Sequence, residues 1–212
     1  MNSNEILEKI IKNKSVAIVG PSSSLCNKSL GKEIDSHDIV IRFNRYTVLD
    51  KTDYGSKIDV LMHNFYVDIP VNSEPLKECK VIISGHDILN RPQNVNNFNK
   101  SVKVFPNIPH IMYDHLKMDT ELKKKIIKGI WKTTGFWTLC LFFDKINLMK
   151  ELKIYGVDFC FNEYNNTYNP THMTPGHNLK YELSLFKKQI YPELKCNKIK
   201  ITDENFLKYL EE

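Results

Sequence analysis

The stretch SVAIVGPSSSLCNKSLGKEIDSHDIVIRFN, residues 15–44, decides the fold of this chain. Its apolar run at 16–19 is bounded by Gly20 and predicts a buried strand that enters a tight turn. A second apolar run at 39–41 closes on a polar tip that ends at Asn44. Strand, glycine turn, helix start and strand form half of a nucleotide-binding α/β unit, in which ligands sit at the carboxyl ends of the strands. Gly20 and Asn44 follow those two ends.

The glycine turn does not identify the ligand by itself. The sequence contains neither the G-x-G-x-x-G dinucleotide fingerprint nor the G-x-x-x-x-G-K-[ST] phosphate loop. A strand that ends in Gly-Pro is also common in ordinary protein cores. The functional interpretation therefore depends on this segment taken together with two others further along the chain.

The rest of the chain alternates apolar runs with helical patterns, which predicts an α/β fold. Further strands are expected at residues 58–62, 80–85, 102–105, 152–156 and 198–202. Helices are expected near the N-terminus and at residues 120–129, 136–149, 177–190 and from 203 onward. We predict a single Rossmann-like domain over 1–212, with a mostly parallel sheet of about six or seven strands and helices on both faces. Residues 86–118 and 161–176, rich in Asn and Pro, are expected to form loops or a small lid.

Composition limits the class of protein and its compartment. The net charge of +5 is mild and no basic run is long, so a nucleic-acid partner is not expected. The five cysteines are odd in number and show no C-x-x-C spacing, which is typical of free thiols in a reducing compartment. The amphipathic first helix lacks the continuous apolar stretch of a signal peptide or membrane anchor. A cytoplasmic protein without a transmembrane segment is therefore predicted.

Three segments resemble the sialylmotifs of glycosyltransferase family 29, the sialyltransferases. Residues 15–45, with the elements E-I-D-S-H (33–37) and R-x-N (42–44), resemble the large motif. KTTGFWTLCLFFDKINLMKELKIYG, residues 132–156, resembles the small motif with its [ST]-[ST]-G turn and its strand-ending Y-G. His177 and Glu182, within residues 177–182, stand at the H-x-x-x-x-E spacing of the very small motif.

The chain is also similar to the compact bacterial sialyltransferases of family 42. The parallels are Met62-His63-Asn64, Gly156-Val157-Asp158-Phe159, and the run HMTPGH over residues 172–177. In both comparisons the catalytic base falls on His177.

These resemblances imply a GT-A variant fold and the transfer of sialic acid from CMP-sialic acid to an acceptor sugar hydroxyl. By this resemblance, the transfer inverts the anomeric centre and needs neither a cofactor nor a metal. The sequence has no Asp-x-Asp motif at a strand end, so it gives no indication of a metal that bridges the donor phosphate. An imidazole titrates near neutral pH and is suited to removing the proton of a hydroxyl, the role expected of His177. The departing phosphate needs hydrogen-bond donors where its charge develops.

Candidate donor-binding residues lie at strand ends, at a helix start and in the loop before His177. The strand-end amides can hold the nucleotide, the helix start offers free backbone N–H groups to an anion, and the hydroxyls can donate to the phosphate. The candidates are Gly20, Ser22, Ser23, Asn44, Asn64, Thr133, Thr134, Gly135, Tyr164, Tyr168 and His172.

Plainer interpretations remain open beside this one. Residues 133–135 taken alone are an ordinary helix N-cap, and Glu182 can be a structural partner that holds a loop by hydrogen bonds. His37 and Asp38 are expected to keep the second strand in place. At the level of function, the alternatives are transfer of another CMP-activated acid sugar such as Kdo, a catalytically silent CMP-binding module, and an α/β scaffold that binds no nucleotide.

Overall fold

The structure is a computed structural model. It describes residues 2–44, 48, 50–66, 69, 76–85, 88–89, 91–116, 118, 133–159, 179–194 and 198–212.

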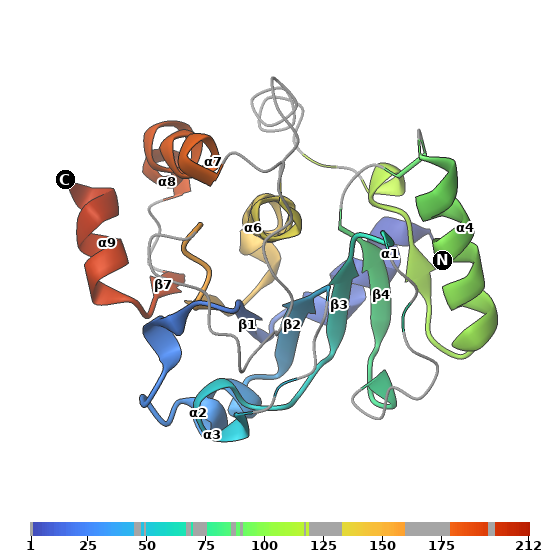
Figure 1. Cartoon of the computed structure of the whole chain (residues 1–212), viewed down its shortest axis with the longest axis horizontal. Coiled ribbons are helices and arrows are strands. Elements are labelled where there is room, and N and C mark those ends of the chain that lie inside the picture. Colours follow the sequence, from blue (N-terminus) through green and yellow to red (C-terminus); the bar gives the residue numbers. More distant parts are fainter. Residues whose placement is uncertain are drawn as a thin grey trace.

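A seven-stranded parallel sheet forms the centre of the described chain, in the order β5-β4-β3-β2-β1-β6-β7 (Figure 1). Its strands are β1 (Ser15–Val19), β2 (Ile39–Phe43), β3 (Val60–His63), β4 (Val81–Ser84), β5 (His110–Ile111), β6 (Glu151–Tyr155) and β7 (Ile199–Ile201). Strands β1 to β4 are almost wholly buried, as expected of parallel strands covered on both faces. The predicted α/β class and strand number are confirmed.

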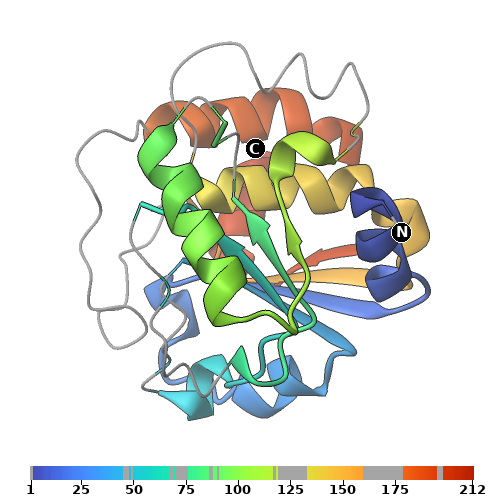
Figure 2. The same ribbon diagram turned by 90° about the vertical axis from the view of Figure 1, so that its right-hand side faces the viewer.

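Helices cover both faces of this sheet (Figures 1 and 2). The larger apolar cluster packs α1, α6, α7 and α9 against one face. On the other face, one smaller cluster includes residues of α2 and α3, and a second smaller cluster includes residues of α4. The helices are α1 (Ser3–Ile11), α2 (Gly31–Ser36), α3 (Lys51–Tyr54), α4 (Pro92–Val104), α6 (Thr134–Asp144), α7 (Leu179–Leu185), α8 (Tyr191–Leu194) and α9 (Glu204–Glu211). Short 3-10 turns η1 (Ser23–Leu25), η3 (Tyr113–His115) and η4 (Ile146–Leu148) and the π-helical turn η5 (Phe186–Ile190) complete the described elements.

The predicted strand at residues 102–105 is wrong, because these residues end helix α4 or follow it directly. The alternating V-K-V-F pattern resembles a strand, but Val102 and Val104 are both exposed. The buried positions of α4 are instead Asn94, Asn97, Phe98 and Ser101, which recur at helical spacing. Three of these four are polar, so apolar periodicity does not reveal the helix.

The expectation of a loop or lid over residues 86–118 is wrong for most of that segment. Helix α4 occupies its middle with Pro92 in the first turn, where a proline is tolerated. The true fifth strand, His110–Ile111, is too short to stand out in the sequence. The segment therefore builds one side of the fold, and Figure 1 shows α4 beside β4.

The other predicted helices agree with the structure where it describes them. Asn2 caps α1 through a capping box with Glu5, Thr133 caps α6, and Asp203 caps α9. The helix expected at 177–190 runs from 179 to 194 as α7, η5 and α8. The helix expected at 120–129 and the loop expected at 161–176 lie outside the described residues.

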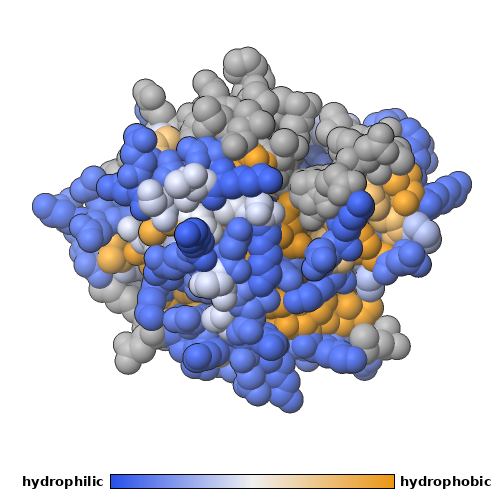
Figure 3. All heavy atoms as spheres, turned by 90° about the horizontal axis from the view of Figure 1, so that it is seen from below, coloured by the Kyte–Doolittle hydropathy of each residue, from blue (hydrophilic) through white to orange (hydrophobic). Residues whose placement is uncertain are grey.

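Three further findings concern the surface and the thiols. No helix in the described chain is long and apolar enough to cross a membrane. The buried Cys79 is a free thiol, and burial raises its pKa to about 11. Seen from below, the face that carries α2 and α3 is largely hydrophilic, with apolar residues gathered toward the side of α4 (Figure 3).

Candidate functional site

The order of the strands places a topological switch point between β1 and β6. From β1 the chain builds the sheet outward through β2, β3, β4 and β5, and then returns to place β6 on the other side of β1. Ligands of open α/β sheets bind outside the carboxyl ends of the strands at such a point. The segments that follow β1, β2, β3 and β6 therefore form the candidate site.

Two glycines bring the ends of β1 and β6 into backbone contact. The N–H of Gly20 donates to the carbonyl of Tyr155 at 2.7 Å, and the N–H of Ser22 donates to the carbonyl of Gly156 at 3.1 Å. A Cβ atom on Gly20 would lie 2.2 Å from the carbonyl oxygen of Gly156, and Gly156 has a φ of +60°. The glycine that ends each strand is thus required by the close approach of the two chains.

The Ser22 hydroxyl is committed to the protein itself. It donates to Oδ2 of Asp158 at 2.6 Å and accepts from the N–H of Ser24 at 3.1 Å. Ser22 and Asp158 are 2% and 5% exposed. Ser23, the next predicted residue, opens the turn η1 and its carbonyl accepts from the N–H of Cys26. The serine loop is therefore held in shape by its own hydrogen bonds and by the carboxylate that follows β6.

Asn44 links three elements at the opposite side of the site. Its Oδ1 accepts from the N–H of Asn64 at 3.0 Å, which assigns the orientation of the amide, and its Nδ2 lies 3.3 Å from Oγ1 of Thr134. Asn44 has a left-handed backbone, φ +54°. An amide NH2 carries two hydrogens, and in the described chain Asn44 uses at most one of them. The second is available to a ligand.

Glu182 fixes the helix start that the small motif contributes. Its carboxylate accepts from the N–H of Thr133 at 2.7 Å and from the Thr133 hydroxyl at 2.6 Å. Glu182 is 1% exposed, so this charge-assisted pair is shielded from water. The Thr133 hydroxyl also caps α6 by accepting from the N–H of Phe136 at 3.1 Å. The interpretation of Glu182 as a structural partner therefore has a direct geometric basis, because it ties α7 to α6.

Two backbone N–H groups remain at the start of α6. Those of Thr134 and Gly135 have no acceptor among the described residues, as is usual for the first turn of a helix. A Cβ atom on Gly135 would meet only ordinary contacts, at 3.8 Å, with Phe43 and Val157. Packing therefore does not require a glycine here, although glycine is unfavourable within a helix. A bare backbone at this position leaves the N–H groups open to an anion.

The E-I-D-S-H element serves the scaffold. Tyr155 donates its hydroxyl proton to Glu33 at 2.8 Å. The Tyr155 hydroxyl oxygen therefore accepts from Nε2 of His37, which lies 2.9 Å away and must carry the proton. Lys153 also donates to Glu33, and this hydrogen bond holds the pKa of the Glu33 carboxyl below its ordinary value. Burial lowers the pKa of His37 and raises that of Tyr155.

Asp35 and Asp38 also serve the scaffold. Asp35 accepts from the N–H groups of Ser56 and Lys57 at 2.9 and 3.0 Å. Asp38 accepts from the N–H of Ser15 at 2.9 Å, which fixes β2 beside β1. The structural role expected of His37 and Asp38 agrees with these contacts.

The sequence does not predict the contacts of the buried polar residues next to the serine loop, although Arg42 and Asp158 both belong to the motifs above. Arg42 is fully buried and donates to the carbonyls of Tyr54 and Lys57 at 2.6 and 3.0 Å. The Tyr54 hydroxyl in turn donates to the carbonyl of Ser22 at 2.7 Å. Asp158 was likewise missed as a partner of Ser22. A charged residue in or beside a buried strand, such as Arg42 or Asp158, indicates that a buried partner exists, but the sequence does not identify that partner.

The predicted residues fall into three groups. Asn44, Asn64 and Thr134 are brought together by hydrogen bonds, and Thr133 and Gly135 adjoin Thr134 at the start of α6. Gly20, Ser22 and Ser23 lie at the switch point on the β1 side. The last group, the proposed base and its neighbours, lies outside the described residues: Tyr164, Tyr168, His172 and His177.

Comparisons with known proteins agree with the resemblance inferred from the motifs. The model of glycosyltransferase family 29 (sialyltransferase) matches residues 7–77, which include the whole large motif. A crystal structure of a mammalian sialyltransferase in complex with Gal-beta-1-3GalNAc-ortho-nitrophenol is similar with a TM-score of 0.59 and 17% identity, covering 95% of this chain and 74% of that one. A second mammalian sialyltransferase crystal structure has a TM-score of 0.54 and 16% identity, covering 96% of this chain and 80% of that one.

No curated protein matches the sequence. The predicted resemblance to family 29 is confirmed, and the fold is the one found in the solved sialyltransferases.

Proposed function

We propose that this protein is a glycosyltransferase that moves sialic acid from CMP-sialic acid to a hydroxyl of an acceptor glycan, by a metal-independent inverting reaction with His177 as the general base. The observation that carries the proposal is the match of residues 7–77 to the sialyltransferase family, whose large motif ends at the cluster of Asn44, Asn64 and Thr134.

The open donors of this cluster give the CMP-sugar its binding groups. The phosphate or the sugar carboxylate would accept from the N–H groups of Thr134 and Gly135, at the positive end of the α6 dipole. The free amide hydrogen of Asn44 would donate to the nucleotide. Because Glu182 fixes Thr133 and the N–H of Asn64 fixes the Asn44 amide, these donors are preorganised and need no rearrangement as charge develops.

The reaction asks little covalent chemistry of the protein. The acceptor hydroxyl gives its proton to the neutral imidazole of His177, and its oxygen attacks the anomeric carbon of the sialic acid. The bond from that carbon to the phosphate oxygen breaks, and CMP leaves with the electron pair. Attack opposite the leaving group inverts the anomeric centre. Tyr164, Tyr168 and His172 are further proposed donors to the departing phosphate.

The test is hydrolysis and transfer with CMP-sialic acid, measured with and without EDTA, for the wild type and His177→Ala. The acceptor is the galactoside Gal-beta-1-3GalNAc-ortho-nitrophenol, which the similar mammalian sialyltransferase binds. We expect turnover that survives EDTA and falls by at least a hundredfold in the variant, since general bases contribute typically ~10²–10⁴-fold. CMP should also raise the melting temperature of both proteins.

Each other outcome points to one alternative. Loss of turnover in EDTA would contradict metal independence, and full activity of His177→Ala would contradict the assigned base. A thermal shift with CMP but no turnover with CMP-sialic acid calls for CMP-Kdo as donor, and inactivity with both identifies a silent CMP-binding module. The absence of both turnover and a thermal shift would reject the proposed function.

A further inference from the structure

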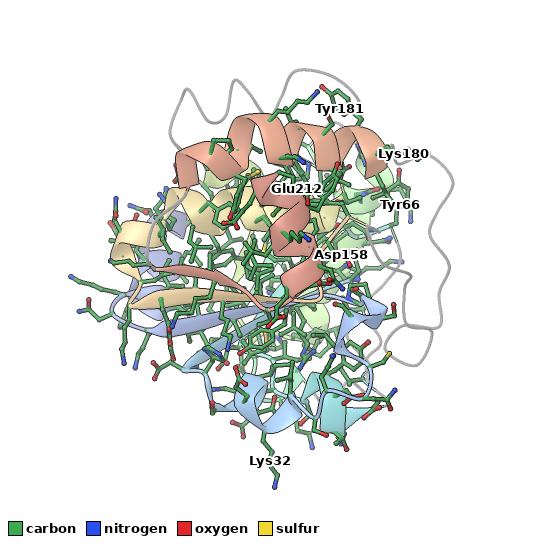
Figure 4. The ribbon with its side chains drawn as sticks, turned by 90° about the vertical axis from the view of Figure 1, so that its left-hand side faces the viewer. Lys32, Tyr66, Asp158, Lys180, Tyr181 and Glu212 are labelled. Carbon is green, nitrogen blue, oxygen red and sulfur yellow. The ribbon has the colours of Figure 1, made fainter. Side chains whose placement is uncertain are left out.

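The turn that follows β3 carries the most exposed aromatic side chain of the described residues. Tyr66 is 61% exposed and stands two residues after Asn64. Figure 4 shows Tyr66 on the same side as Lys180, in the first turn of α7, beyond the ends of the strands. Scattered exposed side chains are normal on a protein surface. The position and the backbone of Tyr66 distinguish it from the others.

Every residue of this turn is pinned by a specific contact. The N–H of Tyr66 donates to Oδ1 of Asn64 at 3.1 Å. From α4, Asn94 donates to the carbonyl of Asn64 at 2.8 Å and Asn97 donates to the carbonyl of Phe65 at 2.9 Å. Both α4 asparagines are 3% exposed. Two buried amides thus hold the two residues that directly precede the exposed tyrosine of this turn.

The backbone of the turn is also strained. Phe65 has a φ of +56°, a conformation that bulky residues rarely adopt. It is held there by burial of its ring against His63 and Phe98, with ring centroids 4.8 and 5.1 Å apart, and by the hydrogen bond from its N–H to Nδ1 of His63 at 3.0 Å. Strain that the surroundings maintain in this way clusters at ligand sites. Here its result is a fixed direction for Tyr66.

The ring itself has a cation beside one face. The guanidinium of Arg91, at the N-cap of α4, lies 5.9 Å from the ring centroid of Tyr66. An aromatic ring that keeps most of its surface in water packs well on the apolar C–H face of a pyranose, while its hydroxyl and a neighbouring guanidinium serve the sugar hydroxyls. Because Asn64 belongs to the proposed donor cluster, a sugar on Tyr66 would lie beside the CMP-sugar.

We propose that Tyr66 is the stacking platform for the acceptor glycan, oriented by Asn94 and Asn97 and assisted by Arg91. The occupant is a neutral hexopyranose at or next to the end of the glycan that carries the attacking hydroxyl. This inference rests on the proposed function and adds to it a residue that determines acceptor binding.

The kinetic test compares Tyr66→Ala, Tyr66→Phe and the control Tyr181→Ala. Tyr181 is the other tyrosine among the large exposed hydrophobic side chains and points away at the top of Figure 4. We expect Tyr66→Ala to raise the acceptor KM at least tenfold, without changing the donor KM or the rate of donor hydrolysis in the absence of acceptor. Tyr66→Phe should keep most of the affinity, and Tyr181→Ala should match the wild type. An unchanged acceptor KM, or an equal rise of the donor KM, overturns the proposal.

A second measurement does not depend on turnover. Wild type and the same variants are applied, in the presence of CMP, to an array of neutral glycans that end in different hexopyranoses. Binding by the wild type and Tyr181→Ala, with at least a tenfold loss in Tyr66→Ala, supports the platform even if sialyl transfer itself is not observed. Equal binding by wild type and Tyr66→Ala, or no binding by either, rejects the platform, while active donor hydrolysis would leave the proposed function standing.

Discussion

The two sides of the candidate site differ in whether their hydrogen-bond donors are already used within the protein. On the closed side, between β1 and β6, the backbones of Gly20 and Gly156 touch and the Ser22 hydroxyl is spent on the buried Asp158. On the open side, formed by the ends of β2 and β3 and the start of α6, one amide hydrogen of Asn44 and the backbone N–H of Gly135 have no acceptor in the described chain. One side joins the two halves of the sheet, and the other has donors left for a ligand.

This difference separates the motif residues by what they do. Glu33, Asp35, His37 and Arg42 of the large motif hold strands and turns, although they belong to the most specific sequence signature of the chain. Asn44, at the end of the same motif, keeps a donor for the ligand. Membership in a motif therefore does not mean contact with the substrate. The contrast makes opposite predictions for similar substitutions on the two sides.

The largest effect is expected for Gly20→Ala on the closed side. The new methyl group would lie 2.2 Å from the carbonyl oxygen of Gly156 and 2.8 Å from a Val157 methyl group, and the first of these is backbone that cannot rotate away. We expect the free energy of unfolding to fall by about 3 kcal/mol, at the upper end of the usual cost of overpacking. Urea unfolding followed by circular dichroism measures it. A loss below about 0.5 kcal/mol, the range of ordinary surface substitutions, would mean that the two strand ends separate easily.

The next effect concerns the link between the open side and α7. Glu182→Ala removes the acceptor of both the Thr133 N–H and the Thr133 hydroxyl in a buried place. We expect a loss of about 2 kcal/mol in the free energy of unfolding, because buried donors without a partner are costly. Binding of CMP, measured by calorimetry, should weaken because the start of α6 loses its support.

Glu182→Gln is the matched control, since its amide oxygen can still accept one of the two hydrogen bonds. It should fall between wild type and Glu182→Ala in both measurements. If the alanine variant loses stability but binds CMP like the wild type, the support that Glu182 gives to the start of α6 does not contribute to nucleotide binding.

Gly135→Ala should behave in the opposite way from Gly20→Ala. Its methyl group meets only ordinary contacts at 3.8 Å, and alanine is the better helix former, so stability should stay level or rise by up to about 1 kcal/mol. The same methyl group would obstruct the approach of an anion to the N–H groups of Thr134 and Gly135. We expect CMP affinity to fall about tenfold, roughly 1.4 kcal/mol, by calorimetry. A stable variant that binds CMP like the wild type would show that the nucleotide does not use the start of α6.

The sequence predicts the strands of the closed side but not how those strands are paired. Apolar runs that end on glycine indicate β1 and β6, because strand burial and tight turns leave strong local signals. Which strands are neighbours is not local: the pairing of Gly20 with Gly156 joins residues more than a hundred positions apart. The contact between Ser22 and Asp158 escapes prediction for the same reason, because no pattern near either residue indicates its partner.

Helix α4 shows a second limit. Its buried face is formed by Asn94, Asn97 and Ser101 together with Phe98, so its pattern is polar where sequence methods look for apolar residues. Those asparagines are buried because they hold the carbonyls of the turn at Phe65. A helix selected to support a turn through hydrogen bonds thus loses the periodicity by which it would be recognised, and the V-K-V-F segment at its end resembles a strand instead.

The smallest effect is a pH dependence of stability from His37, beneath the closed side. His37 donates through Nε2 to Tyr155, and its Nδ1 is buried without a hydrogen-bond partner among the described residues. Burial lowers the pKa of His37 in the folded protein, so the unfolded chain binds the proton more readily. The stability contributed by neutral His37 is therefore complete above its unfolded pKa, near 6.5, and is lost as the pH falls below that value and through the folded pKa.

Urea unfolding of the wild type between pH 7.5 and 5 should show this decline. Replacing His37 with Gln, which keeps a donor but does not titrate, should reduce the slope. The carboxylates Glu33 and Asp38, whose pKa values are lowered by the hydrogen bonds from Lys153 and Ser15, lose their contribution only at more acidic pH and do not obscure the window. An equal slope in both proteins would mean that protonated His37 is accommodated, and that the closed side is looser than its hydrogen bonds indicate.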